Sequence, residues 1–278
     1  MKKKINDLYL KVVEDIILSR IHPYSYSKIE YFNNNVLKNF IKFILINIYN
    51  KNNQYLVTKR KISDDEIEDG LIRASNSYSM IGNKRLLNIK YLIQKISEEN
   101  IEGDLIEAGI WKGGVLIYMR ACLLTLGENR SVYGADSFKG LPLVDDIKYP
   151  DDKIYKKILK KGNDKGLIIS KGEVILNLKK FDFYDDKTIL LEGWFENTLN
   201  DPRIQKLSLL RIDGDMYKST YEALDMLYDK VSKGGFIVID DYGLGSMSCK
   251  KAVDDFRKKN NIKSKLVKID WTGVFWKK

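Results

Sequence analysis

Four aspartates in two short motifs carry the most chemistry in this sequence. Asp213 and Asp215 form an Asp-Gly-Asp motif after one apolar run, and Asp240 and Asp241 follow the next such run. Carboxylates gathered at one place repel one another unless protons or a cation intervene. Oxygen ligands suit Mg²⁺, Ca²⁺ or Mn²⁺, whereas the absence of nearby His or Cys argues against zinc. The alternative is that these carboxylates are solvated or cap helices.

Two loops earlier in the chain have the residue types of a nucleoside site. Residues 107–114 read Glu-Ala-Gly-Ile-Trp-Lys-Gly-Gly, and their glycines let a ligand approach the backbone closely. Their spacing differs from G-x-G-x-x-G, which argues against a dinucleotide pyrophosphate. Asp136 ends the following apolar run, where a carboxylate commonly holds a ribose diol. The alternatives are a structural turn at the glycines and a loop cap at Asp136.

The elements that must position these residues alternate between strand and helix from residue 104 onward. We expect five strands, at 104–108, 131–135, 188–191, 207–212 and 235–239. Helices are expected at 113–126, from the fourth strand through Val231, and at 249–259, followed by a hairpin at 265–276. This order predicts an α/β doubly wound sheet of seven strands with an antiparallel closing hairpin. Ligands bind such sheets at the carboxyl ends of the strands.

The first hundred residues have a helical texture instead. The apolar pattern predicts helix from about Leu8 to Tyr49, a polar break from Asn50 to Asp69, and helix again from Met80 to Ile96. No run approaches the roughly 18–20 apolar residues of a membrane span. The apolar run 40–49 is too short and contains a lysine; it suits packing on the domain or a partner, with peripheral membrane contact as the alternative. These apolar helices favour a homo-oligomer.

Composition limits the remaining classes. The chain has 278 residues and a formal net charge of +10, of which +8 lies before residue 62. Such an excess favours solvated lysines over an anionic partner, and we expect no nucleic acid because no reader motif is present. Two cysteines form no disulfide framework, which favours a reducing, cytoplasmic setting. His22 is the single histidine, so serine and cysteine hydrolase triads are excluded.

Together the motifs resemble the macrocin O-methyltransferase (TylF-like) family, whose members are S-adenosylmethionine- and Mg²⁺-dependent sugar O-methyltransferases. The matching runs occur in family order over nearly the whole chain, at 79–82, 107–114, 135–142, 193–195, 210–217, 235–242 and 252–256. The resemblance implies the Rossmann-like sheet of class I methyltransferases with an N-terminal helical extension. It implies an extension or lid over residues 1–78 and a methyltransferase domain over residues 79–278.

The resemblance also implies roles for single residues. Mg²⁺ would be bound by Asp213, Asp240 and Asp241, with Asp215 as general base and Lys218 as a lower-ranked alternative base. Residues implied to bind S-adenosylmethionine are Met80 as a cover, Glu107, Gly109 and Gly113 near the methionine end, Asp136 and Ser137 at the ribose, and Ser170, Gly193 and Trp194 near the adenine. Segments 28–64 and 143–165 depart from the family pattern, so acceptor contacts are expected there and the acceptor is not carried over.

Two rival functions remain open from the sequence. A metal-dependent glycosyltransferase would use Asp213-Gly-Asp215 as a D-x-D motif for a nucleotide sugar, but this leaves the Glu107 loop and Asp136 unexplained as a pair. A catalytically inert scaffold is the other rival, and the intact set of four aspartates speaks against it. The acceptor is expected to be a small glycoside or a saccharide.

Overall fold

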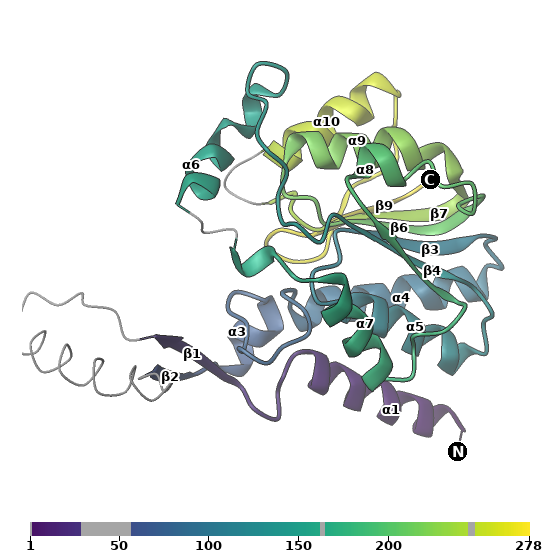
Figure 1. Cartoon of the computed structure of the whole chain (residues 1–278). Coiled ribbons are helices and arrows are strands. Elements are labelled where there is room, and N and C mark those ends of the chain that lie inside the picture. The colour runs from purple at the N-terminus through teal and green to yellow at the C-terminus, as the bar shows by residue number, and fades with distance from the viewer. Residues whose placement is uncertain (1, 29–56, 162–164, 244–247) are drawn as a thin grey trace, which may run out of the picture.

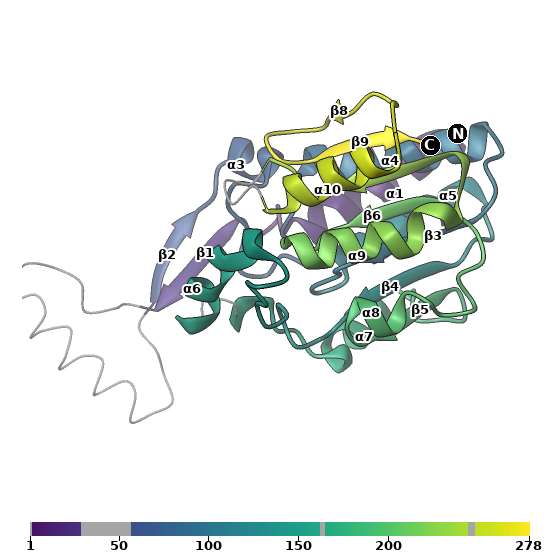
Figure 2. The same ribbon diagram turned by 90° about the horizontal axis from the view of Figure 1, so that it is seen from above.

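A seven-stranded sheet forms the centre of the molecule in the computed structural model, which describes residues 2–28, 57–161, 165–243 and 248–278 (Figures 1 and 2). The strand order is β5-β4-β3-β6-β7-β9-β8. The first five of these strands run parallel to one another, and β9 runs antiparallel to both of its neighbours. The predicted doubly wound sheet with its closing hairpin is confirmed. The bounds are β3 Asp104–Ala108, β4 Val132–Asp136, β5 Thr188–Glu192, β6 Leu207–Ile212, β7 Val231–Ile239, β8 Val267–Lys268 and β9 Val274–Lys277.

Helices cover both faces because successive strand residues point to opposite sides. Leu105 and Leu209 pack on one face, against α1, α4, α5 and α7, whereas Ile106 and Leu210 pack on the other, against α9 and α10. Figure 1 shows these two helical layers above and below the sheet. The bounds are α1 Lys2–Ile17, α4 Asn83–Glu98, α5 Gly114–Leu126, α7 Lys171–Lys180, α8 Phe195–Thr198, α9 Tyr217–Leu227 and α10 Ser248–Lys259. Each strand therefore contributes to two hydrophobic cores.

The sheet reverses its winding direction between β3 and β6. The chain moves outward from β3 to β4 and β5, then returns to the other side of β3 for β6 and β7. Ligands of such sheets bind where the order reverses. At that point the carbonyl of Ala108 accepts a hydrogen bond from the Asp213 amide at 2.8 Å, and the carbonyl of Ala135 accepts one from Gly109. The ends of β3, β4 and β6 are thus held together.

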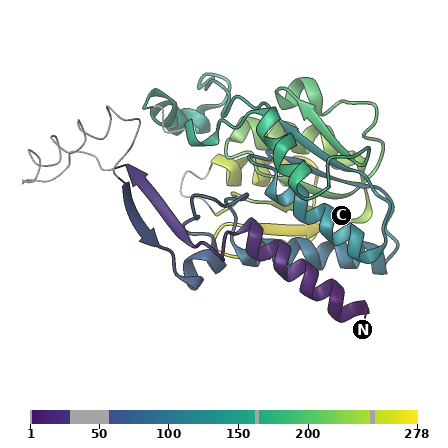
Figure 3. The same ribbon diagram turned by 60° about the horizontal axis from the view of Figure 1, so that its bottom comes forward.

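The N-terminal region differs from its prediction. Helix α1 packs on α5, but β1 (Tyr24–Lys28) and β2 (Val57–Lys61) form an antiparallel ribbon beside the sheet (Figures 1 and 3). The helical prediction is therefore wrong at residues 24–28, where the alternation Tyr-Ser-Tyr-Ser has the period of a strand. The predicted polar break contains β2 and α3 (Asp64–Asp69), whose N-cap Ser63 forms a capping box with Glu66. Predictions on residues 29–56, including the apolar run 40–49, lie outside the described residues.

Three other differences concern where elements begin or end and which elements were not predicted. The helix predicted through Val231 ends at Leu227, because a 3-10 turn (Tyr228–Lys230) leads directly into β7 and Val231 pairs with Leu207. Between β4 and β5 the chain forms α6 (Tyr155–Lys160), α7 and 3-10 turns at Pro150–Ile154 and Lys165–Leu167, none of which was predicted. Met80 precedes α4, which begins at Asn83. Among the helices described, none is long and apolar enough to cross a membrane.

Candidate active site

A cleft opens at the carboxyl ends of β3, β4, β5 and β6. Its empty space is about 740 Å³, with the open mouth included. Eight of the predicted site residues line it: Met80, Gly109, Asp136, Ser137, Gly193, Trp194, Asp213 and Asp215. The lining also includes Trp111, Lys218 and Glu222. The structure therefore gathers residues that lie 142 positions apart, from Met80 to Glu222, around one cavity.

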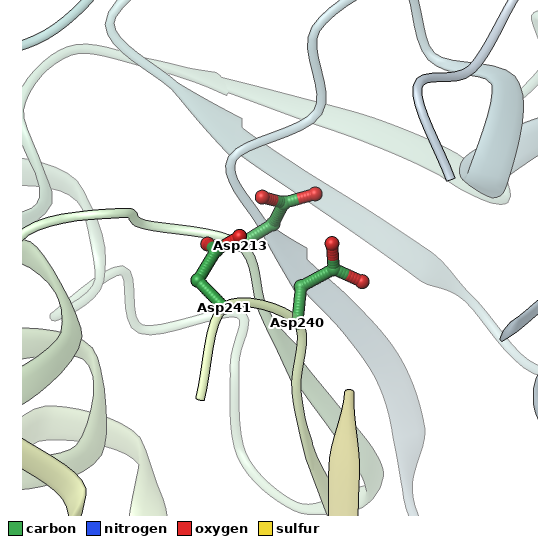
Figure 4. Close-up of side chains that lie close together, drawn as sticks. All are labelled: Asp213, Asp240 and Asp241. Carbon is green, nitrogen blue, oxygen red and sulfur yellow. The ribbon is translucent and has the colours of Figure 1, made fainter. Parts of the chain in front are cut away.

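Beside the cleft, three aspartates form what we call the acidic cluster: Asp213, Asp240 and Asp241. Asp213 follows β6 and the other two follow the neighbouring strand β7 (Figure 4). One oxygen from each carboxylate lies within 4.8 Å of the others. Asp213 belongs to both the cleft and the cluster. These three side chains can share a small cation, which connects the possible metal site directly to the ligand cavity.

A buried arginine joins this cluster to the glycine-rich loop. Arg211 is fully buried on β6 and donates hydrogen bonds to Glu107, to Asp213 at 3.0 Å and to Asp240. Arg85, at the start of α4, pairs with the second oxygen of Asp240 and with Asp270, the latter at 2.8 Å. Neither arginine was predicted from the sequence to have a role in the site. The signal for Arg211 was a single charged residue inside the apolar run Leu207–Ile212.

The region as a whole contains more acids than bases. Glu107, Asp213, Asp240 and Asp270 share the two guanidinium groups, and two further buried carboxylates, Asp215 and Asp241, lie beside them without an arginine partner among the described residues. Burial, and then repulsion from Asp240, raise the pKa of Asp213 to about 6. Burial, and then repulsion from Asp213, raise the pKa of Asp215 to about 7. Burial, and then repulsion from Asp215, raise the pKa of Asp241 well above its ordinary value. This shortage of positive charge is the electrostatic condition that a bound divalent cation relieves.

Asp215 is held in an uncommon backbone conformation. Its φ is 55°, in the left-handed region that side chains other than glycine seldom occupy. The amide of Asp215 donates to Asp241 at 3.1 Å, and its carbonyl accepts from the hydroxyl of Tyr155 at 2.9 Å. Tyr155 comes from α6, in the segment between β4 and β5 that the sequence left unassigned. These two contacts fix the position of the Asp215 backbone at the wall of the cleft.

Gly109 is required by the close approach of two strand ends. Its φ is 91°, and a Cβ at this position would lie 1.9 Å from the carbonyl oxygen of Asp213. Only glycine allows that contact. Asp136 then ties the glycine-rich loop to the end of β4, accepting hydrogen bonds from the amides of Ile110 at 2.9 Å and Phe138 at 2.7 Å. Burial raises the pKa of Asp136, and the backbone hydrogen bonds lower it in part.

Glu107 lies behind the cleft rather than on its wall. It is 1% exposed; one carboxylate oxygen accepts from Arg211, and the other has no hydrogen-bond partner among the described residues. Burial raises the pKa of Glu107 to about 8, although Arg211 opposes the shift. An unpartnered buried oxygen is costly, and a donor from a ligand would satisfy it.

Four other predicted residues also lie outside the cleft lining. Asp240 and Asp241 are buried in the acidic cluster, and Gly113 begins α5 with a φ of 81°. The hydroxyl of Ser170 accepts from the amide of Glu173 and caps α7. Neither Gly113 nor Ser170 contacts the cavity directly, so their predicted cofactor roles stay predictions.

Comparison with known proteins connects this geometry to a family. The profile of the macrocin O-methyltransferase (TylF) family matches residues 6–278. The chain is 41% identical over 205 residues to the demethyldecarbamoylnovobiocin O-methyltransferase of Streptomyces niveus, covering 73% of this chain and 77% of that protein. It is 38% identical over 204 residues to the 8-demethyl-8-(2,3-dimethoxy-alpha-L-rhamnosyl)-tetracenomycin-C 4'-O-methyltransferase of Streptomyces olivaceus, covering 73% and 76%.

A solved structure agrees with these sequence relatives. The O-methyltransferase NovP superposes with a TM-score of 0.80 at 31% sequence identity, over 98% of this chain and 99% of that chain. These matches give no support to the glycosyltransferase alternative. The chain therefore belongs to the macrocin O-methyltransferase family, and it is an S-adenosylmethionine-dependent O-methyltransferase.

Proposed function

We propose that this enzyme methylates a sugar hydroxyl and that a divalent cation, Mg²⁺ by preference, assists the reaction. The observation that carries the proposal is the position of Asp213, which lines the cleft and also belongs to the acidic cluster. Among the relatives, the protein of Streptomyces olivaceus is named for methylation at the 4' position of a rhamnosyl compound. That name supports a saccharide acceptor, a glycoside or a polysaccharide, for this chain.

The donor site is proposed to be the part of the cleft beside β3, β4 and β5. The unpartnered oxygen of Glu107 suits the methionine ammonium group, and we assign Asp136 and Ser137, which line the cleft, to the ribose. Gly193 and Trp194 are proposed to contact the adenine, and Met80, which also lines the cleft, is proposed to cover the cofactor. Bound S-adenosylmethionine would supply the methyl group as a sulfonium.

The metal site is proposed to be the acidic cluster. Hard cations prefer carboxylate oxygens, and the excess of buried carboxylates over guanidinium groups fits a divalent ion. Asp240 already accepts from both arginines, so Asp213 and Asp241 have the less committed oxygens. A cation bound there would orient the acceptor hydroxyl and lower its pKa.

Asp215 is the proposed general base. In methyl transfer the acceptor oxygen forms a bond to the methyl carbon while the carbon–sulfur bond breaks, and the hydroxyl proton must be accepted by a base. The raised pKa of Asp215, about 7, suits proton transfer near neutral pH. The hydrogen bond to Glu196 at 2.8 Å and the attraction of Glu222 outweigh burial and raise the pKa of Lys218, so Lys218 stays protonated and is a poor base.

We also propose a domain division, a cellular location and an oligomeric state, all of which were first inferred from the sequence. We keep the division into an extension or lid over 1–78 and a methyltransferase domain over 79–278, and a cytoplasmic location. Ile5, Leu8 and Val12 are exposed on α1, on the side away from α5, which supports a homo-oligomer. Sedimentation equilibrium tests this, because a mass near 32.3 kDa at micromolar concentration would contradict it.

Calorimetry and radiolabel transfer test the proposed function together. We expect S-adenosylhomocysteine to bind the full chain with 1:1 stoichiometry, and tritium from labelled S-adenosylmethionine to reach a saccharide acceptor only when Mg²⁺ is present. Failure to bind S-adenosylhomocysteine would overturn the donor site. Undiminished transfer in excess EDTA would overturn the metal role alone.

A further inference from the structure

A second cavity adjoins the cleft on the side of the N-terminal ribbon. Its empty space is about 1150 Å³, mouth included, and it shares Met80 and Trp111 with the cleft. The walls come from β1, the segment after α3, the loop before α5 and the 3-10 turn Lys165–Leu167. We call it the basic cavity, because the charged side chains that line it are Arg73, Lys112 and Lys165.

The charge of the basic cavity is unbalanced. No Asp or Glu belongs to its described lining, and none of Arg73, Lys112 and Lys165 forms an ion pair with any described residue. The Lys112 ammonium donates a long hydrogen bond of 3.4 Å to the carbonyl of Ser77. Most other arginines of the chain form ion pairs, so an unpaired Arg73 that shares a cavity free of described acids with two lysines needs a reason.

Trp111 brings two of these cations together at the boundary with the cleft. The Arg73 guanidinium lies 5.3 Å from the centre of the indole ring, and the Lys112 ammonium lies 4.5 Å from it. The indole nitrogen donates to the carbonyl of Gly166 at 2.9 Å, which fixes the ring against the turn that carries Lys165. Burial, with repulsion from Arg73, lowers the pKa of Lys112, although Glu173 attracts it from a distance. An anion in the cavity would relieve that repulsion.

The number of cations favours a phosphate over a single carboxylate. A phosphate ester carries nearly two charges and has three acceptor oxygens, which matches two ammonium groups and a forked guanidinium. Ser25 and Ser75 also line the cavity, and their hydroxyls are potential uncharged donors; the Ser75 oxygen accepts from the amide of Tyr26 at 2.9 Å. Arg73 and Lys165 are exposed to solvent, so a ligand can reach them without unfolding the site.

We propose that the basic cavity binds a phosphate group of the acceptor, so that the methylated sugar belongs to a sugar phosphate or a nucleoside diphosphate sugar. This inference rests on the proposed function for the identity of the adjoining cleft as the site of methyl transfer. Trp111 and Met80 separate the phosphate from the donor, and the sugar spans this boundary toward Asp215.

Isothermal titration calorimetry with uridine diphosphate as the probe and uridine as its uncharged control tests the proposal. The full chain is saturated with S-adenosylhomocysteine in EDTA, so that metal-mediated binding at the acidic cluster does not contribute. The test variant is Arg73→Gln/Lys112→Gln. The matched control, Lys233→Gln/Lys268→Gln, removes two exposed charges that do not line the cavity.

The expected result is uridine diphosphate binding to the wild type and to the control, at least tenfold weaker binding to the test variant, and no measurable binding of uridine. Affinity for S-adenosylhomocysteine should stay within twofold. Equal probe binding by both variants, or none by the wild type, overturns the proposal. A tenfold loss of S-adenosylhomocysteine affinity in the test variant also overturns it, because the cations would then serve the methionine carboxylate. None of these results touches the donor site itself, which fails only if the wild type does not bind S-adenosylhomocysteine.

Discussion

The acidic cluster and the basic cavity show the same imbalance with opposite sign. The cluster is buried at the ends of two central strands, and two arginines partly neutralise it. The basic cavity is open, and its cations stand on loops and turns without any described acid to pair with. Rigid strand ends suit chemistry that depends on fixed distances, whereas loops suit recognition of a particular acceptor. Charge that the chain leaves unmatched thus indicates a cation in one region and an anion in the other.

The largest effect is expected at Asp215, the proposed general base beside the acidic cluster. Asp215→Asn should lower kcat by roughly 10²–10⁴-fold, because an amide cannot accept the hydroxyl proton. Affinity for S-adenosylhomocysteine should be unchanged. Asp225→Asn, an exposed aspartate on α9, is the control and should retain full turnover. Steady-state kinetics and calorimetry measure both quantities, and a turnover number equal to that of wild type would assign the base elsewhere.

A second experiment tests whether the buried ion pairs around the acidic cluster stabilise the fold. Arg211→Met leaves Glu107 without its ion-pair partner and Asp240 with Arg85 alone, and removal of one member of a buried pair typically costs about 3–5 kcal/mol. The surface pair of Arg203 with Asp201 gives the contrast, since Arg203→Met should cost at most about 1 kcal/mol. Urea denaturation measures both free energies of unfolding. Equal losses would mean that the buried network is not a structural frame.

Gly109 tests the contact between the glycine-rich loop and the acidic cluster. Gly109→Ala introduces a Cβ 1.9 Å from the Asp213 carbonyl, so the strand ends must separate. Gly127→Ala is the control, because Gly127 also has a positive φ of 72° but no described atom within 4 Å of the added carbon. The control should lose about 1–2 kcal/mol from backbone strain. Gly109→Ala should lower the free energy of unfolding by more than the control does and should bind S-adenosylhomocysteine at least tenfold more weakly. Equal losses of stability in the two variants would contradict a contact between Gly109 and the Asp213 carbonyl.

The pH dependence of stability tests the shortage of cations. The folded-state pKa values of Asp213 and Asp215, about 6 and 7, lie above the unfolded value near 4. The native state therefore binds more protons between about pH 4 and 7, and stability falls as pH rises through that window. Metal-free protein should melt at a higher temperature at pH 5.5 than at pH 8, and Mg²⁺ should raise Tm more at pH 8. Calorimetric Tm values that are independent of Mg²⁺ at both pH values would contradict a shared cation.

The smallest effect is expected in the basic cavity. Arg73→Gln should change the free energy of unfolding by no more than about 0.5 kcal/mol, because Arg73 is an exposed residue without an ion-pair partner among the described residues, even though its guanidinium lies over Trp111 and is partly buried. Urea denaturation in parallel with Arg211→Met completes the comparison. A loss of several kcal/mol would show that Arg73 serves the fold, and the assignment of this cavity to a ligand would weaken.

The sequence predicted the sheet and the meeting of the aspartates for one physical reason. Parallel strands are continuous apolar runs, and their carboxyl ends must share an edge, so Asp213 and Asp240 had to be neighbours. The ion-pair partners of Arg211 could not be predicted from the sequence, because no local pattern indicates which carboxylates lie beside it in the fold. The ribbon of β1 and β2 is short and mostly exposed, so its alternation was weak. The basic cavity could not be predicted from the sequence, because Arg73 and Lys165 lie 92 positions apart and lysine is common throughout the chain.

The central claim is that the acidic cluster holds a divalent cation beside the methyl donor. Electron paramagnetic resonance of Mn²⁺, titrated into the full chain saturated with S-adenosylhomocysteine, tests it most directly. We predict one bound Mn²⁺ per chain in the wild type, displaced by excess Mg²⁺, and binding at least tenfold weaker in Asp241→Asn, which removes a cluster carboxylate that neither arginine engages. The account is contradicted if the wild type leaves all Mn²⁺ in solution, or if Asp241→Asn binds it as tightly as the wild type does.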